Sequence, residues 1–209
     1  MNDRLLDYAI RIQSIAQAGL AYCEDKYGRE RYEELRKISA EMISAKTDIP
    51  LEKVYDLFCN ESGYQTPKLD TRGAVFIDGK ILLVRENNGT WSLPGGWCDV
   101  DLSVAENTEK EVLEETGLML TEYRYCGLVT FVSDVWPTEY MHLFHATGFT
   151  GTPKDCDEGE LAWIDKRKLA ALQQWEGDRI FLKLMDAHVP FFSLKLVYAG
   201  DTLMEAVLN

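Results

Sequence analysis

The stretch that decides the fold is Gly96-Trp-Cys-Asp-Val-Asp-Leu-Ser-Val-Ala-Glu-Asn-Thr-Glu-Lys-Glu-Val-Leu-Glu-Glu-Thr-Gly-Leu118. Within it, Ser103 is followed three residues later by Glu106, which is the spacing of a capping box that begins a helix. Gly117 stands where a left-handed C-cap would end the same helix. The sequence therefore predicts a helix from about Val104 to Thr116.

Acidic side chains are concentrated in the second half of this helix. Glu111 and Glu115 are four residues apart, so they neighbour each other on the helix surface, with Glu114 on an adjacent edge. Like charges at this spacing destabilise an isolated helix. A divalent cation reverses that effect, because Mg²⁺ and Mn²⁺ bind carboxylates, water and substrate phosphates. The pattern is typical either of a metal site or of a solvated acidic face.

A turn rich in Pro and Gly precedes the helix, in the order Trp91-Ser92-Leu93-Pro94-Gly95-Gly96. The proline and the two glycines end an apolar strand and allow the backbone to approach another group closely. The carbonyl of Gly95 is therefore a further candidate ligand for the same metal.

Together these residues resemble the Nudix hydrolases, whose box is G-x5-E-x7-R-E-U-x-E-E-x-G-U, where U is a bulky aliphatic residue. The box runs here from Gly96 to Leu118, and the resemblance covers residues from roughly 70 to 200. Two positions differ from the family pattern. Lys110 replaces the arginine, which keeps the charge but loses the planar guanidinium, and Leu102 replaces the first glutamate.

The resemblance implies metal-dependent hydrolysis of a diphosphate linkage in a small nucleotide, with Mg²⁺ or Mn²⁺ as cofactor. It assigns Glu111 and Glu115 as the main metal ligands, and Glu114 as a further ligand or a base. The Gly95 carbonyl would be another ligand, and Lys110 would orient a glutamate.

A base outside the box is expected in the acidic loop before Leu161-Ala-Trp-Ile164, where Nudix enzymes commonly place one. Asp157, Glu158 and Glu160 are the candidates, and Glu160 is favoured. A solvated acidic loop is the alternative for each residue. The aromatic side chains of Trp97, Trp136 and Tyr140 are candidates for stacking on a substrate ring, or for the protein core.

The pattern of apolar residues divides the chain into two parts. Residues 3 to about 60 have helical periodicity, which predicts three helices, and residues 64–70 read as a linker. From residue 71 short strands follow, with Asp78-Gly79 as a hairpin turn. Further expected elements are strands at 123–132, 140–149 and 161–164 and helices at 168–174 and 179–188. The prediction is an all-helical module at 1–65 and an α+β domain at 66–209, for which the resemblance implies the Nudix α/β/α sandwich with a mixed sheet.

The N-terminal helices also resemble a module that precedes some bacterial Nudix hydrolases, including CDP-choline and ADP-ribose pyrophosphatases, with Gly63-Tyr-Gln-Thr-Pro-Lys68 at the junction. This resemblance implies a homodimer and makes CDP-choline and ADP-ribose the leading candidate substrates. A helical cap that only stabilises the domain is the alternative.

Composition restricts the other partners. The formal net charge of −13 argues against sequence-independent binding of nucleic acid, which needs a basic surface. No apolar run approaches the roughly 20 residues of a membrane span, so no membrane partner is expected. The five cysteines include no C-x-x-C pair, which favours a reducing cytoplasm.

Two other functions remain open at this stage. One is a house-cleaning enzyme for oxidised nucleoside triphosphates, which releases pyrophosphate. The other is a non-catalytic sensor of nucleotide sugars, since such Nudix domains usually have degraded boxes and Leu102 is a step in that direction. The three retained box glutamates and the lack of a basic DNA-binding segment favour catalysis.

Overall fold

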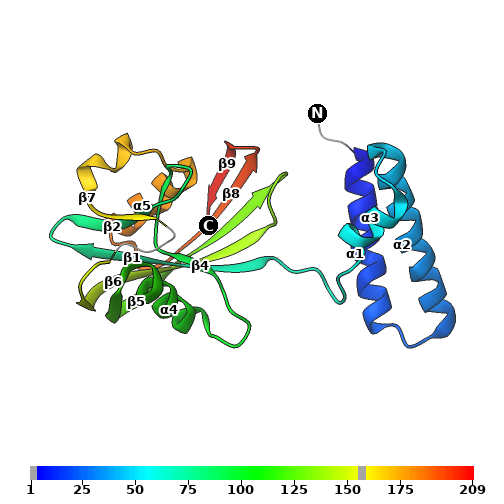
Figure 1. Cartoon of the computed structure of the whole chain (residues 1–209), viewed down its shortest axis with the longest axis horizontal. Helices are drawn as coiled ribbons and strands as arrows, with labels where there is room; N and C mark the ends of the chain where they lie inside the picture. Colours follow the sequence, from blue (N-terminus) through cyan, green and yellow to red (C-terminus); the bar gives the residue numbers. More distant parts are fainter. Residues whose placement is uncertain (1–3, 155–158) are drawn as a thin grey trace. The chain divides into compact units, whose positions relative to one another are not determined.

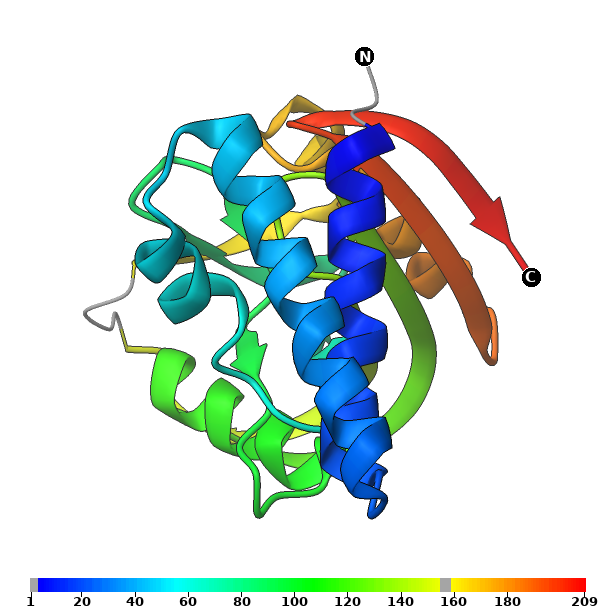
Figure 2. The same ribbon diagram turned by 90° about the vertical axis from the view of Figure 1, so that its right-hand side faces the viewer.

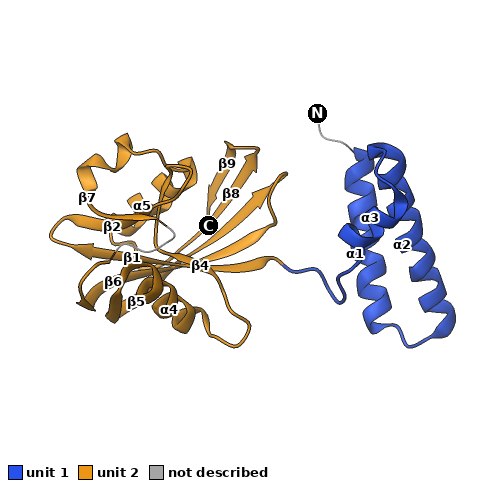
Figure 3. Ribbon diagram, viewed as in Figure 1, with its two compact units in different colours: residues 1–66 blue, residues 67–209 orange. Residues whose placement is uncertain are grey.

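The computed structural model describes residues 4–154 and 159–209 of the 209-residue chain. Backbone contacts separate the chain into two units, residues 1–66 and residues 67–209 (Figure 3). Each unit has a hydrophobic core of its own. In the part that the structure describes, no helix is long and apolar enough to cross a membrane.

The first unit consists of helices α1 (Arg4–Tyr22), α2 (Lys26–Thr47) and α3 (Leu51–Phe58), which confirms the three predicted helices. Helices α1 and α2 lie side by side and are joined by a short turn (Figures 1 and 2). Asp25 caps α2 by accepting a hydrogen bond from the Gly28 N–H. The buried amides of Gln13 and Gln17 donate to the carbonyls of Phe58 and Gly63, and so attach α1 to the end of α3 and to the segment after it.

The second unit is built on a nine-stranded mixed sheet in the described residues, with the order β3-β2-β1-β6-β5-β8-β9. Strand β4 also pairs with β1, and β7 pairs with β2. The β1–β6 and β5–β8 pairs are parallel, and the other pairs are antiparallel. The strands are β1 (Lys68–Ile77), β2 (Lys80–Arg85), β3 (Trp91–Ser92), β4 (Gly95–Trp97), β5 (Leu118–Ser133), β6 (Glu139–Gly151), β7 (Glu160–Asp165), β8 (Phe192–Ala199) and β9 (Thr202–Leu208).

Helices cover both faces of this sheet. Alternate residues of a strand point to opposite faces, and Ala74 and Val75 of β1 accordingly belong to two different core clusters. The first cluster contains Phe181 of helix α5 (Glu176–Asp186), and the second contains Val112 of helix α4 (Val104–Thr116). The two helices lie on opposite sides of the sheet (Figure 1). The predicted α+β class and α/β/α sandwich with a mixed sheet are confirmed.

Five elements differ from the sequence-based expectation. Residues 68–70, read as part of a linker, already belong to β1, where they pair with β6 and β4. The helix expected at 168–174 is a 3₁₀-helix, η1 (Lys166–Ala171), and α5 begins at Glu176 instead of residue 179. Strands β8 and β9 were not predicted; β8 pairs in parallel with β5, and β9 pairs with β8 at the edge of the sheet.

Candidate active site

Helix α4 has the predicted ends. The Ser103 Oγ accepts from the Glu106 N–H, and the Glu106 carboxylate accepts from the Ser103 N–H at 2.9 Å, so both halves of the capping box form. Gly117 ends the helix in the left-handed conformation with φ 72°. These contacts fix the start and the length of the helix that carries the box glutamates.

The buried side chain of Asn107 fixes α4 to the strands before it. Its amide Nδ2 donates to Thr71 Oγ1 at 2.8 Å and to the Trp97 carbonyl at 3.3 Å. Its Oδ1 accepts from the Asp99 N–H at 3.0 Å. One side chain thus holds β1, the end of β4 and the following loop, which sets the distance between the glycine turn and the glutamates. Neither the box pattern nor the capping signal pointed to Asn107.

Glycine is required at position 95 by a close approach of two backbones. Gly95 has φ 141°, and a Cβ there would lie 1.9 Å from the Thr71 carbonyl oxygen. Its N–H donates to the Glu115 Oε2 at 3.1 Å, and Glu115 is only 9% exposed. At the next position, a Cβ on Gly96 would approach Glu111 Oε2 to 3.0 Å. The turn therefore lies directly against both box carboxylates.

A cavity of about 430 Å³, here named the glutamate pocket, brings these groups together. It is lined by Arg72, Val84, Glu86, Ser92, Gly95, Gly96, Trp97, Glu111 and Glu115. The described residues contain no cluster of three or more His, Cys, Asp or Glu side chains with metal-binding geometry. Two carboxylates beside a glycine backbone nevertheless suit Mg²⁺, which usually takes one or two carboxylates and completes its shell with water and substrate phosphates.

Lys110 does not line this cavity, but its ammonium group is close to three carboxylates. Its Nζ is 3.0 Å from Glu111 Oε1, 3.1 Å from Glu114 Oε2 and 3.4 Å from Asp99 Oδ2. The hydrogen bonds to Glu111 and Glu114 raise the pKa of the lysine, so it remains a cation. The exposed side chain of Glu114 is directed to Lys110 and does not line the glutamate pocket. The assignment of Glu114 as a ligand or base stays a prediction.

Glu160 is the first residue of β7, and its exposed carboxylate lies 3.6 Å from Arg85 Nη1. It lines neither the glutamate pocket nor the second pocket described below. Asp157 and Glu158, the other candidates for a base, lie outside the described residues. The base outside the box therefore stays a prediction.

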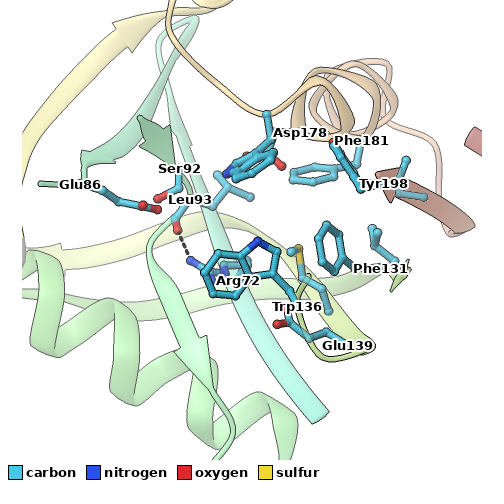
Figure 4. A pocket seen from close by; sticks show the side chains of 14 residues that line it. Arg72, Glu86, Ser92, Leu93, Phe131, Trp136, Glu139, Asp178, Phe181 and Tyr198 are labelled. Atoms are coloured by element: carbon cyan, nitrogen blue, oxygen red, sulfur yellow. Dashed lines mark hydrogen bonds between the residues drawn. The ribbon is translucent and has the colours of Figure 1, made fainter. Parts of the chain in front are cut away.

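Figure 4 shows a second cavity of about 190 Å³, here named the aromatic pocket. The two share Arg72, Glu86 and Ser92. Its other lining residues are Leu93, Val129, Phe131, Trp136, Glu139, Met141, Trp175, Asp178, Phe181, Leu196 and Tyr198. Five aromatic side chains thus surround a space that also contains carboxylates, which suits a planar ring with N–H donors.

Burial changes the acidity of two carboxyls in the aromatic pocket. It raises the pKa of Asp178 to about 7, against the opposing effect of Arg72. Burial also raises the pKa of Glu139, and the nearby Asp70 carboxylate raises it further.

Of the three aromatic residues singled out in the sequence, Trp136 lines this pocket and Trp97 lines the glutamate pocket, whereas Tyr140 lines neither.

Arg72 is a site residue that the sequence reasoning missed. Its Nε and Nη2 each donate to the Asp70 carboxylate at 2.8 Å, and its Nη1 donates to the Leu93 carbonyl at 3.2 Å. Burial opposes its charge, but the Asp70 carboxylate outweighs burial and the net pKa is raised. The signal available in the sequence was Asp70-Thr-Arg72, because residues two apart on a strand share a face.

Comparison with known proteins places this fold and site in a family. Residues 67–185 match the model of the NUDIX domain, and residues 3–58 match a model described as a UDP-X-like, N-terminal oligomerisation domain. The chain belongs to the Nudix family, and its second unit contains the NUDIX domain. The predicted family and the predicted N-terminal module are confirmed.

Three similar proteins illustrate the range of relatives. The "Putative ADP-ribose pyrophosphatase YjhB" of Bacillus subtilis is 56% identical over 113 residues, which are 54% of this chain and 54% of that protein. An oxidized purine nucleoside triphosphate hydrolase of Danio rerio is 28% identical over 69% of this chain and 96% of its own. A crystal structure of a MutT protein from Bacillus halodurans has a TM-score of 0.64 at 24% identity, covering 68% of this chain and 97% of that one, which shows the shared fold.

Proposed function

We propose that this protein hydrolyses the diphosphate linkage of a nucleoside diphosphate joined to another group, of the ADP-ribose or CDP-choline type. Water is added across the linkage, so the products are a nucleoside monophosphate and a phosphorylated second group. The observation that carries the proposal is the placement of Glu111 and Glu115 in one pocket with the glycine turn, beside an aromatic pocket.

The metal-binding part of the site is proposed to be Glu111, Glu115 and the Gly95 backbone. The N–H of Gly95 holds the Glu115 carboxylate in place, and Lys110 holds the Glu111 carboxylate from outside the pocket. When bound there, Mg²⁺ or Mn²⁺ would neutralise phosphate charge and lower the pKa of a bound water. A charge-neutralising cation is needed, because the pocket is acidic and the substrate is an anion.

The aromatic pocket is proposed to hold the base of the nucleotide. Aromatic side chains stack on any base, and the carboxyls of Glu139 and Asp178 can accept from ring or exocyclic N–H groups. The naming of the Bacillus relative supports ADP-ribose. CDP-choline is proposed from the resemblance of the N-terminal helices noted in the sequence, whereas the family model of residues 3–58 is described as UDP-X-like.

Hydrolysis of nucleoside triphosphates is the second candidate function. It is favoured by the similarity to the Danio rerio hydrolase, which extends over 96% of that protein. Product analysis separates the two functions. ADP-ribose hydrolysis yields AMP and ribose 5-phosphate, and CDP-choline hydrolysis yields CMP and phosphocholine, whereas a triphosphatase of this class releases pyrophosphate. Pyrophosphate from oxidised triphosphates, with ADP-ribose and CDP-choline left intact, would favour the second function.

The N-terminal helices are proposed to form a homodimer. On α1, Tyr8, Ile15 and Tyr22 follow one another at seven-residue spacing, and each is more than half exposed. Side chains at that spacing form one apolar stripe on a helix. The family description of residues 3–58 as an oligomerisation domain supports this proposal. A cytoplasmic location is proposed from the cysteine spacing alone.

A further inference from the structure

We propose that Arg72 binds a phosphate oxygen of the substrate at the junction of the glutamate pocket and the aromatic pocket. This inference rests on the proposed function, because it requires a substrate with phosphate groups. Arg72 lies on β1, where it pairs with Gly95 of β4, so its backbone is part of the scaffold that carries the glycine turn.

The position of Arg72 is the first observation. Among the described residues that line either pocket, Arg72 is the only lysine, arginine or histidine, and it lines both. In Figure 4 its side chain lies at the pocket, with the hydrogen bond to Leu93 drawn. A nucleotide with its phosphates at Glu111 and Glu115 and its base in the aromatic pocket must pass this junction. The arginine therefore lies where a phosphate is expected.

The hydrogen bonds of Arg72 are the second observation. A guanidinium has five N–H donors. Nε and Nη2 use one donor each on Asp70, and Nη1 uses one on Leu93, so three are occupied within the described residues. One donor on each terminal nitrogen remains, on a side chain that is 23% exposed. The bidentate contact with Asp70 holds the guanidinium in one orientation, which reduces the entropy lost when it binds an anion.

Charge is the third observation. The groups that face Arg72 include the carboxyls of Asp70, Glu86, Glu139 and Asp178, so an anionic substrate meets negative charge on most sides. Within the part of the chain that the structure describes, Arg72 is the only cationic side chain that lines either pocket, so it can attract a phosphate without a metal. The ion pair with Asp70 explains how the charge of Arg72 is tolerated where it is largely buried. It does not explain why the side chain lines both cavities.

The test compares binding of AMP with adenosine, and CMP with cytidine, to the full-length protein in EDTA by isothermal titration calorimetry. We expect the wild type to bind the monophosphate at least about tenfold more tightly than the nucleoside, because Arg72 would form a charge-assisted bidentate contact with the phosphate. Arg72→Lys keeps the charge beside Asp70 but loses the fork, and it should remove most of this preference. Arg124→Lys is the matched control, because Arg124 also donates to backbone carbonyls but lines neither pocket.

Two results would overturn the assignment: a wild type with no preference for the monophosphate, or an Arg72→Lys variant that keeps it. Thermal unfolding of each variant without ligand shows whether the fold is retained. Since these titrations contain no metal, they are independent of turnover. A protein that shows the preference but hydrolyses none of the candidate substrates would refute the proposed function and leave the role of Arg72 intact.

Discussion

Asp99 Oδ2 lies 3.4 Å from Lys110 Nζ, so the lysine of the box helix is held by a carboxylate that precedes Leu102 by three residues. Leu102 stands where the family pattern has a glutamate and offers no charge of its own. The loop is fixed by the Asn107 contact with the Asp99 N–H. Asp99 therefore supplies an acidic partner for Lys110 that the box pattern alone does not reveal.

Asp99→Asn is expected to lower kcat only about twofold, because exposed ion pairs contribute little and the Asp99 side chain is 60% exposed. Lys110→Met is expected to lower kcat about tenfold, because it removes the charge-assisted hydrogen bond to Glu111 as well. Lys110→Arg should stay close to the wild type. Steady-state hydrolysis with Mg²⁺ measures all three, with exposed Asp101→Asn as the control in the same loop. Equal losses for Asp99→Asn and Lys110→Met would contradict this ranking.

Glu115→Gln is expected to lower hydrolysis at least about a hundredfold while the fold is retained, because an amide is a poor ligand for Mg²⁺. The amide oxygen can still accept from the Gly95 N–H, so the melting temperature should change little. Glu109→Gln is the matched control, since Glu109 lies on the same helix and is bonded to Tyr123 away from the pocket. Undiminished turnover of Glu115→Gln with Mg²⁺ would refute the metal assignment.

Gly95→Ala is expected to destabilise the protein by about 3 kcal/mol or more, because the left-handed backbone and the contact with the Thr71 carbonyl add to each other. Gly79→Ala is the matched comparison. Gly79 also has a positive φ, 74°, but a Cβ there meets no atom within 4 Å, so about 1 kcal/mol is expected. Urea denaturation measures both variants. A Gly95→Ala variant no less stable than Gly79→Ala would show that the turn adapts.

The local signals in the sequence were sufficient for α4 and for the hairpin at Asp78-Gly79, because capping and turn chemistry act within a few residues. They also predicted that Glu111 and Glu115 share one face of a helix. The glycine turn was expected to approach another group closely, and the structure identifies that group as the β1 backbone at Thr71.

Residues whose role depends on distant partners were missed. The position of Arg72 depends on Asp70, on the Leu93 carbonyl and on the two cavities that it lines. The spacing of Asp70 and Arg72 signals the ion pair, but nothing near them in the chain signals the two cavities. Strand β8 is recognised as a strand by its parallel pairing with β5, from which it is separated by some sixty residues. The structure shows buried residues at alternate positions of β8. In the sequence, however, these residues form a short apolar run that can also be interpreted as the end of a helix.

The raised pKa of Asp178, about 7, predicts a pH dependence of stability. The folded protein holds this proton above the pH at which an unfolded Asp loses it, about 4. The contribution of the protonated Asp178 carboxyl to the free energy of unfolding is therefore fully present below about pH 4. It is lost as the pH rises to about 7. Asp178→Asn removes this loss, so its stability relative to the wild type should increase between about pH 5 and pH 8.

The free energy of unfolding of Asp178→Asn and wild type, measured by urea denaturation at both pH values, checks this difference. Asp186→Asn serves as the control, because Asp186 lies at the other end of the same helix, paired with Lys166. If the Asp178→Asn difference is the same at both pH values, the carboxyl titrates normally in the folded protein.

The apolar stripe on α1 predicts that Ile15→Asp shifts the dimer toward monomer, because an aspartate would be placed in the middle of the interface. Light scattering with the full-length protein at micromolar concentrations measures the mass. Leu57→Asp is the matched control, since Leu57 is an exposed aliphatic residue on α3. A wild type that is monomeric throughout would refute the dimer, and an unchanged Ile15→Asp dimer would locate its interface elsewhere.

The most direct test of the central claim is hydrolysis of a substrate panel with Mg²⁺, with Mn²⁺ and with EDTA. The panel contains ADP-ribose, CDP-choline, other nucleotide sugars, dinucleotides and oxidised triphosphates, and monophosphate products are detected through phosphatase-released phosphate. We predict turnover of one nucleoside diphosphate derivative that requires the metal and is abolished by EDTA. Binding without turnover across the whole panel would contradict the account, and would make Leu102 the residue that separates this chain from its catalytic relatives.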